Sequence, residues 1–218
     1  MDRQENNLLI HLLAPKNRNK WHPTWEHCYK FWENSNYNIT MWDDASIDNL
    51  LKEDDSDFFH ELNSLPKIFK LDYVRYLILE KFGGAYFDLD IEVKLDFLPF
   101  LSTQRTYLME ATSHDEIVQN SIMISLDKTP FSTYFWSNIK NYSKSKIINN
   151  PKICKDEFSI VPKWANVKVM VGPIMLSEVY KSYSTNPNIQ LLSHLHFNVF
   201  PHDFKICIHH QTGNWGVQ

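Results

Sequence analysis

The stretch from Ile68 to Ile91 reads IFKLDYVRYLILEKFGGAYFDLDI and changes character in the middle. Its first part, 68–82, carries apolar residues at helical spacing, which predicts a helix with a broad apolar face. Gly83 and Gly84 then end the helix, because glycine tolerates the left-handed conformation of a helix C-cap. From Ala85 to Ile91 apolar and polar side chains alternate, which predicts a strand.

This alternation places two carboxylates side by side. If Phe87 and Leu89 face the core, Asp88 and Asp90 share the opposite face of the strand. Neighbouring carboxylates repel each other, and a divalent cation relieves that repulsion. We therefore expect a metal site here, on a strand that continues through 92–96.

A longer pattern, D-x-x-R-(x)10-Y-x-D-x-D, surrounds this pair. It is formed by Asp72, Arg75, Tyr86, Asp88 and Asp90. It resembles the sugar-donor region of the family 32 glycosyltransferases, which include fungal mannosyltransferases and have the large clostridial glucosylating toxins as distant relatives. The resemblance covers most of the chain. It implies one catalytic domain over residues 1–218, with an α/β fold of the glycosyltransferase-A type: a twisted mixed sheet flanked by helices in a Rossmann-like arrangement.

The resemblance also implies an activity: metal-dependent, retaining transfer of a sugar from a UDP- or GDP-sugar. The acceptor, whether glycan, lipid or protein, is not readable from the sequence. Asp90 is the expected metal ligand, and Asp88 binds the metal through water or holds the ribose and donor sugar. Oxygen ligands with an imidazole suit Mn²⁺, with Mg²⁺ as the alternative. Arg75 is expected near the donor sugar and diphosphate, and Asp72 near sugar hydroxyls.

Some of these residues have simpler interpretations. Asp72 and Arg75 are three residues apart on a helix, so they also suit a surface ion pair. Tyr86 also suits an ordinary strand aromatic. His11, in a predicted strand over 8–13, matches a family histidine of the donor site, and a buried structural histidine is the equal alternative. The family tryptophan near the nucleobase is replaced by Ala14, so the base stays open.

Two further regions resemble the family. Asn120 matches an asparagine near the donor sugar. The segment 208–215, IHHQTGNW, resembles an H-H-x-x-G-S-W ending that folds over the diphosphate. This resemblance implies that His209 or His210 binds the metal, and that Asn214 and Trp215 contact the donor.

Composition narrows the class of protein. The chain has 218 residues, of which 43% are hydrophobic, so it is long and apolar enough to bury a core. A net charge of −4 gives no reason to expect nucleic acid as a partner. The cysteines Cys28, Cys154 and Cys207 form no C-x-x-C pair, which favours reduced thiols. No apolar run suits a signal peptide or a transmembrane segment, so we expect a cytoplasmic protein.

Two other functions use similar residues. A haloacid-dehalogenase-like phosphohydrolase also places D-x-D after a strand, with the first Asp as nucleophile. A non-catalytic sugar- or metal-binding module is the other alternative, with zinc held by histidines. The candidate histidines are His194, His196, His202, His209 and His210.

Local signals complete the prediction. Thr24 is expected to cap a helix that begins near Trp25, and Asp43 to cap a helix over 45–51. The segment 144–163 is polar and is expected to be irregular.

Overall fold

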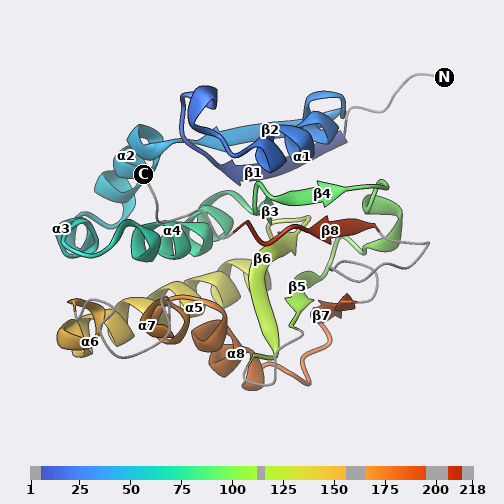
Figure 1. Ribbon diagram of the computed structural model, residues 1–218. Coiled ribbons are helices and arrows are strands. Elements are labelled where there is room, and N and C mark those ends of the chain that lie inside the picture. Colours follow the sequence, from blue (N-terminus) through green and yellow to red (C-terminus); the bar gives the residue numbers. More distant parts are fainter. Residues whose placement is uncertain (1–5, 112–115, 156–164, 195–205, 213–218) are drawn as a thin grey trace.

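The computed structural model describes residues 6–111, 116–155, 165–194 and 206–212 (Figure 1). Within these ranges the strands form one six-stranded sheet and one two-stranded sheet. None of the helices in the described part of the chain has both the length and the apolar character needed to cross a bilayer.

The larger sheet is mixed. Its strands, in spatial order, are β2 (Tyr37–Trp42), β1 (Asn6–Leu13), β3 (Gly84–Phe87), β6 (Val118–Ser125), β5 (Thr106–Glu110) and β7 (Ile189–Leu192). Strand β1 runs parallel to β2 and β3, whereas β6 runs antiparallel to β3 and β5, and β7 runs parallel to β5. The smaller sheet pairs β4 (Ile91–Val93) with β8 (Cys207–His209) in antiparallel orientation.

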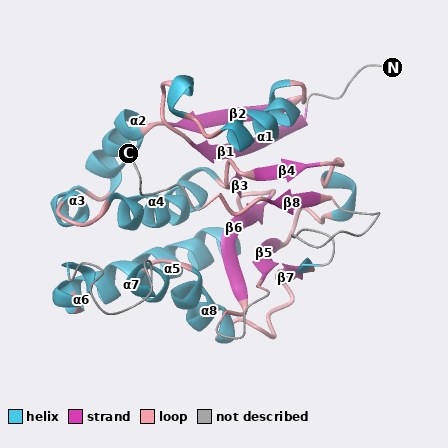
Figure 2. Ribbon diagram, in the orientation of Figure 1, coloured by secondary structure: helices cyan, strands magenta, loops and turns pink. Residues whose placement is uncertain are grey.

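Helices connect and cover these strands. They are α1 (Pro23–Glu33), α2 (Asp44–Asp54), α3 (Ser56–Asn63), α4 (Lys67–Phe82), α5 (Pro130–Asn149), α6 (Pro151–Lys155), α7 (Ala165–Met170) and α8 (Pro173–Lys181), with 3-10 turns η1 (Arg18–Lys20) and η2 (Leu98–Phe100). Figure 2 shows α4 and α5 lying side by side, and α1 on the other side of the molecule.

Two hydrophobic clusters fill the opposite faces of the larger sheet. Tyr86 belongs to the cluster covered by α2–α8, whereas its neighbours Ala85 and Phe87 belong to the cluster that includes α1, β4 and β8. Leu89 and Ile91 are buried in this second cluster with Phe87, so the predicted core side of the motif is confirmed.

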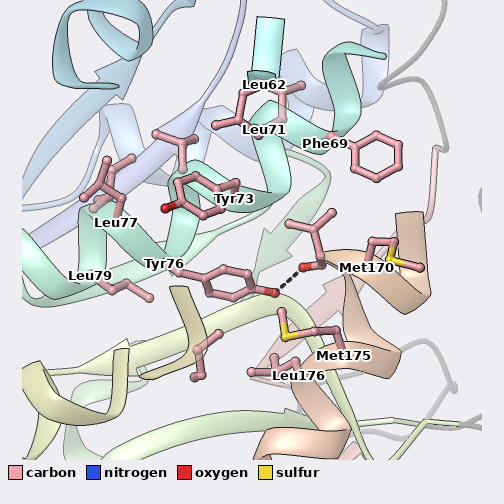
Figure 3. Packing of buried hydrophobic residues seen from close by; sticks show 14 of the residues in the cluster. Leu62, Phe69, Leu71, Tyr73, Tyr76, Leu77, Leu79, Met170, Met175 and Leu176 are labelled. Carbon is pink, nitrogen blue, oxygen red and sulfur yellow. Dashed lines mark hydrogen bonds between the residues drawn. The ribbon is translucent and has the colours of Figure 1, made fainter. Parts of the chain in front are cut away.

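Helix α4 runs through the first cluster and is buried over most of its circumference. Near its middle, Tyr76 reaches the segment that precedes α8 and donates a hydrogen bond of 2.8 Å to the carbonyl of Val171 (Figure 3). Met170 and Met175 lie on either side of Val171 in the same cluster. This bond ties α4 to α8 beside the residues of the predicted site.

The predicted strand from Ala85 onward is interrupted, which corrects the expected continuous strand. The backbone amide of Asp88 donates to Ser121 in β6 at 2.8 Å, and the amide of Ile91 then donates back to Asp88 at 3.0 Å. This turn over 88–91 ends β3. The next strand, β4, pairs with β8 and therefore does not belong to the larger sheet. It ends at Val93 rather than extending through 92–96.

Other local predictions have mixed outcomes. Asp43 caps α2 in a reciprocal capping box with Ser46, as predicted. The cap of α1 is His22 rather than Thr24, because the His22 ring nitrogen accepts the amide of Thr24 and Pro23 starts the helix. The part of 144–163 that the structure describes is not irregular, since it continues α5 and forms α6.

Candidate active site

A turn at two glycines connects α4 to β3, the strand that leads to Asp88. Gly83 and Gly84 have φ of 67° and 83°, a region that favours glycine. A Cβ on Gly84 would lie 2.3 Å from the carbonyl oxygen of Leu9 in β1. Only glycine therefore lets the chain leave α4 and enter the sheet directly beside β1. This turn sets Asp88, at the end of β3, against the side chains of α4.

Arg75 is the centre of the first part of the site. Its guanidinium lies 3.0 Å from Asp72 and 3.2 Å from Asp88, and it donates to the backbone carbonyl of Asn120 at 3.0 Å. The Tyr86 ring lies under the guanidinium, with 4.9 Å between Cζ and the ring centroid. Four residues of the predicted pattern meet here, and each is at most 6% exposed: Asp72, Arg75, Tyr86 and Asp88.

These contacts exclude a surface ion pair. Tyr86 donates a hydrogen bond of 2.6 Å to the same Asp88 oxygen that Arg75 contacts. Burial lowers the pKa of Arg75, but Asp72 and Asp88 more than compensate, so its pKa is raised and it stays charged. Burial raises the pKa of Asp88 to about 6, because Arg75 offsets only part of the cost of burying a carboxylate. The pKa of Asp72 is raised by burial for the same reason.

The second part of the site is a group of three metal-binding side chains. Asp88, Asp90 and His209 each offer one ligand atom, and these atoms lie within 4.8 Å of one another. His209 reaches the site because β8 pairs with β4 in a register that sets it opposite Ile91. The structure thereby separates the two candidate histidines. His209 faces Asp90, whereas His210 lies 3.0 Å from Glu92.

The Asp90 carboxylate supports cation binding. Its Oδ2 accepts hydrogen bonds from the Thr212 amide at 2.8 Å and from the Thr212 hydroxyl at 3.0 Å. Its Oδ1 is buried and accepts no hydrogen bond from the described residues, with His209 Nε2 at 3.3 Å. A buried carboxylate oxygen without a donor carries a desolvation cost that a cation relieves. Two carboxylates and an imidazole suit Mn²⁺.

The pKa shifts of Asp90 and His209 show that the two groups attract each other's charge, and a metal ion would take the place of the proton that His209 shares with Asp90. Burial alone raises the pKa of Asp90, but nearby His209 and the Thr212 donors outweigh it and leave the pKa lowered. Burial alone lowers the pKa of His209, but Asp90 and Asp88 outweigh it and leave the pKa raised.

His11 in β1 is paired with Tyr86 of β3 in the larger sheet. Its Nδ1 accepts a hydrogen bond from the Trp42 indole at 3.1 Å, and its Nε2 lies 3.0 Å from the carbonyl oxygen of Gly83. Burial lowers the pKa of His11 to about 4, so it is neutral. Both ring nitrogens of His11 thus have partners within the fold, and its contact with the donor stays a prediction.

Five of the predicted residues lie outside the described residues or away from the site. Asn214 and Trp215 lie outside the described residues, as do His196 and His202. His194 pairs with Glu110 at 2.8 Å rather than with another histidine. In the described part of the chain, the three-residue metal cluster is therefore the one at Asp88, Asp90 and His209. The three cysteines are free and buried, as expected for reduced thiols.

Two residues of the site were missed. Thr212 occupies a variable position of the tail pattern, so nothing in the sequence marked it. Gly172 is the N-cap residue of α8. A Cβ there would lie 3.3 Å from Asp72 Oδ2 and 2.9 Å from the Cα of Lys168. Its lack of a side chain lets α8 begin directly against Asp72, a close approach that the adjacent glycine and proline hinted at.

The site agrees with the matches to known proteins. Residues 19–107 match the model of the family described as "Glycosyltransferase sugar-binding region containing DXD motif". Among solved structures, the chain is similar to PaToxG Glycosyltransferase, with a TM-score of 0.50 and 16% identity over 83% of this chain and 70% of that one. This likeness concerns the fold and confirms the predicted glycosyltransferase-A type. The fold and the matched sugar-binding region are those of the glycosyltransferases.

Within this class, the sequence is similar to fungal mannosyltransferases. It is 28% identical over 199 residues to Inositol phosphoceramide mannosyltransferase 1 of Schizosaccharomyces pombe, covering 89% of this chain and 56% of the relative. It is also 28% identical over 150 residues to Mannosyl phosphorylinositol ceramide synthase CSH1 of Saccharomyces cerevisiae, covering 67% of this chain and 35% of the relative. The chain thus spans about half the length, or less, of these relatives. The family resemblance seen in the sequence is confirmed, and the phosphohydrolase and binding-module alternatives are disfavoured.

Proposed function

We propose that this protein transfers a sugar from a nucleoside-diphosphate sugar in a metal-dependent reaction that retains the anomeric configuration. The observation that carries the proposal is the buried Asp88–Asp90–His209 group with the Arg75 guanidinium on the other side of Asp88. The guanidinium supplies a positive charge, and the carboxylates and the imidazole would bind a cation beside it. A departing nucleoside diphosphate needs such charge, because breaking the anomeric bond moves electrons onto it.

The charged residues of the site would have different roles in this reaction. Asp88, Asp90 and His209 would hold the divalent cation, which supplies Lewis-acid stabilisation of the leaving diphosphate when bound. Arg75 is held in place by Asp72 and Asp88 and contributes a fixed cation beside them. Asp72, which lies next to Gly172, would accept hydrogen bonds from sugar hydroxyls. Retention follows if the acceptor attacks from the face that the diphosphate leaves.

The substrates are proposed from the relatives. Both fungal relatives are named for mannose transfer to a phosphoinositol ceramide. Mannose is therefore the first donor sugar to test, and inositol phosphoceramide the first acceptor. The nucleobase stays open because Ala14 replaces the tryptophan that the family resemblance would place there.

The test is a screen of UDP- and GDP-sugars for Mn²⁺-dependent hydrolysis or transfer, with ¹H NMR of the first-formed anomer. We expect activity with one donor, its loss in chelator, and retention of configuration. Asp90→Asn removes a ligand charge and should abolish the activity, whereas Asp57→Asn on the exposed start of α3 should not. Equal rates in chelator and in Mn²⁺ would reject the metal, and an inverted product would reject retention.

A further inference from the structure

The two oxygens of Asp90 have different surroundings. Thr212 donates to Oδ2 through both its backbone amide and its hydroxyl. The His210 amide also donates to the Asp90 carbonyl at 3.1 Å, which fixes the tail beside the turn. Oδ1 is left toward His209. A carboxylate rotates easily about its last side-chain bond, so the Thr212 contacts decide which oxygen faces the other ligands.

The Thr212 hydroxyl is itself oriented by α1. The Trp25 indole donates a hydrogen bond of 3.1 Å to Thr212 Oγ1. An indole N–H only donates, so the hydroxyl oxygen must accept there and its single proton is free for Asp90. Trp25 is 3% exposed and packs in the core cluster of α1, which makes it a rigid anchor.

From this chain of contacts we infer that Thr212 and Trp25 are positioning residues of the metal site. They hold Oδ2 of Asp90 so that Oδ1 faces Asp88 and His209. The inference rests on the proposed metal-dependent function, but it concerns residues outside the proposed ligand set. Hydrogen bonds of this kind to metal ligands commonly change metal affinity by about 10- to 100-fold.

The test uses the full chain and Mn²⁺ alone, without donor. Free Mn²⁺ is measured by electron paramagnetic resonance for wild type, Thr212→Val, Thr212→Ser, Trp25→Phe and Asp90→Asn. We expect Thr212→Val to bind Mn²⁺ at least about tenfold more weakly. Thr212→Ser, which keeps the hydroxyl, should bind like wild type, and Trp25→Phe should weaken binding less than Thr212→Val does.

Two controls separate positioning from folding. Trp21→Phe removes an indole N–H that donates to the Pro15 carbonyl and should leave Mn²⁺ affinity unchanged. The second control is the circular dichroism spectrum of Thr212→Val, which should match that of wild type and so show that the fold is retained. If Thr212→Val is unstable, the Ser variant and Trp25→Phe still carry the test.

The outcomes distinguish the two claims. Wild-type affinity in Thr212→Val, alongside lost binding in Asp90→Asn, overturns the inference and leaves the proposed function standing. An equal loss in Thr212→Ser and Thr212→Val also overturns it, because the hydroxyl would then be irrelevant. Binding by Asp90→Asn equal to wild type overturns the metal site itself.

Discussion

Arg75 shows how a single residue can link two halves of a site. Its guanidinium touches Asp72 on its own helix and Asp88 beyond β3, while the Tyr86 ring supports its face. A planar fork can satisfy two carboxylates and stack at once, whereas an ammonium group cannot. The sequence pattern assigned these residues to one donor site and offered a surface ion pair of Asp72 with Arg75 as the alternative. It predicted neither the contact of Arg75 with Asp88 nor the burial of the group.

This leads to a prediction for Arg75→Lys. The lysine keeps the charge but loses the second carboxylate contact, so we expect a fold that is retained and a turnover reduced by at least about tenfold. Steady-state kinetics and circular dichroism check the two parts. The matched control is Arg18→Lys, which changes an exposed arginine paired with Glu26 and should leave turnover unchanged. Wild-type turnover in Arg75→Lys would show that the fork is not required.

The second prediction concerns the effect of His11 on how the free energy of unfolding depends on pH. Its Nδ1 accepts the Trp42 indole, so only the neutral ring fits. Its pKa is lowered from 6.5 to about 4. Between these values the unfolded chain binds a proton that the folded chain does not. Stability from this group is therefore complete above about pH 6.5 and falls by up to about 3 kcal/mol as the pH drops to about 4.

Denaturant unfolding at pH 7 and pH 4.5 measures this effect. His11→Gln keeps an acceptor and a donor but does not titrate, so its stability should fall less between the two pH values than that of wild type. His60→Gln makes the same change at an exposed position and should follow wild type. A fall as steep in His11→Gln as in wild type would assign the pH dependence to other groups.

At the scale of elements, the α4–β3 connection explains how the residues of the pattern on the helix come into contact with the carboxylate that follows the strand. The turn at Gly83 and Gly84 brings β3 beside β1, and so sets the distance between the arginine of α4 and the carboxylate after β3. The sequence predicted the helix, the glycine end and the start of the strand, because each has a local signal. It did not predict the break at Asp88, because that turn depends on β4 pairing with the distant β8.

The two glycines are expected to differ in sensitivity. Gly84→Ala combines a positive φ with a Cβ at 2.3 Å from backbone, so it should lower the free energy of unfolding by roughly 2–4 kcal/mol. Gly83→Ala has the positive φ but meets a side-chain atom of Lys128 at 3.2 Å, and should cost less. Chemical denaturation of both variants checks the order. An equal cost would show that strain, not contact with β1, dominates.

Two truncations test the tail element by element. Ending the chain after Thr212 keeps His209 and the Asp90 contacts, so Mn²⁺ binding should persist while donor binding reports on Asn214 and Trp215. Ending it after Ile208 removes His209 and Thr212, so Mn²⁺ binding and turnover should both be strongly reduced in a folded protein. Isothermal titration with Mn²⁺ and then donor separates the effects. Wild-type behaviour of the shorter chain would remove the tail from the site.

On the scale of the whole molecule, ligand binding should appear as stability. A ligand that binds the folded chain alone stabilises it by about 2.7 kcal/mol at 100 times its Kd. For a chain of 218 residues this corresponds to a rise in Tm of about 5–11 °C. We expect this rise with Mn²⁺ and the correct donor together, and its loss in Asp90→Asn. A shift of equal size in chelator would mean that the donor binds without metal.

The mixed sheet and its helices were predicted mainly through the resemblance, since strand order depends on contacts that local patterns do not encode. The choice between His209 and His210 shows what local sequence patterns cannot predict. Both flank the same strand end, and only the register with β4 turns the first toward Asp90 and the second toward Glu92.

That register also has a consequence for biosynthesis. Asp90 and Thr212 are separated by 122 positions in the chain, and β4 has no sheet partner until β8 has left the ribosome. A nascent chain can form α4 and display both aspartates, yet it lacks the histidine and the threonine that complete the centre. Under the proposed function, products that end before His209 are therefore expected to lack activity, because the metal centre is complete only after this region has been translated.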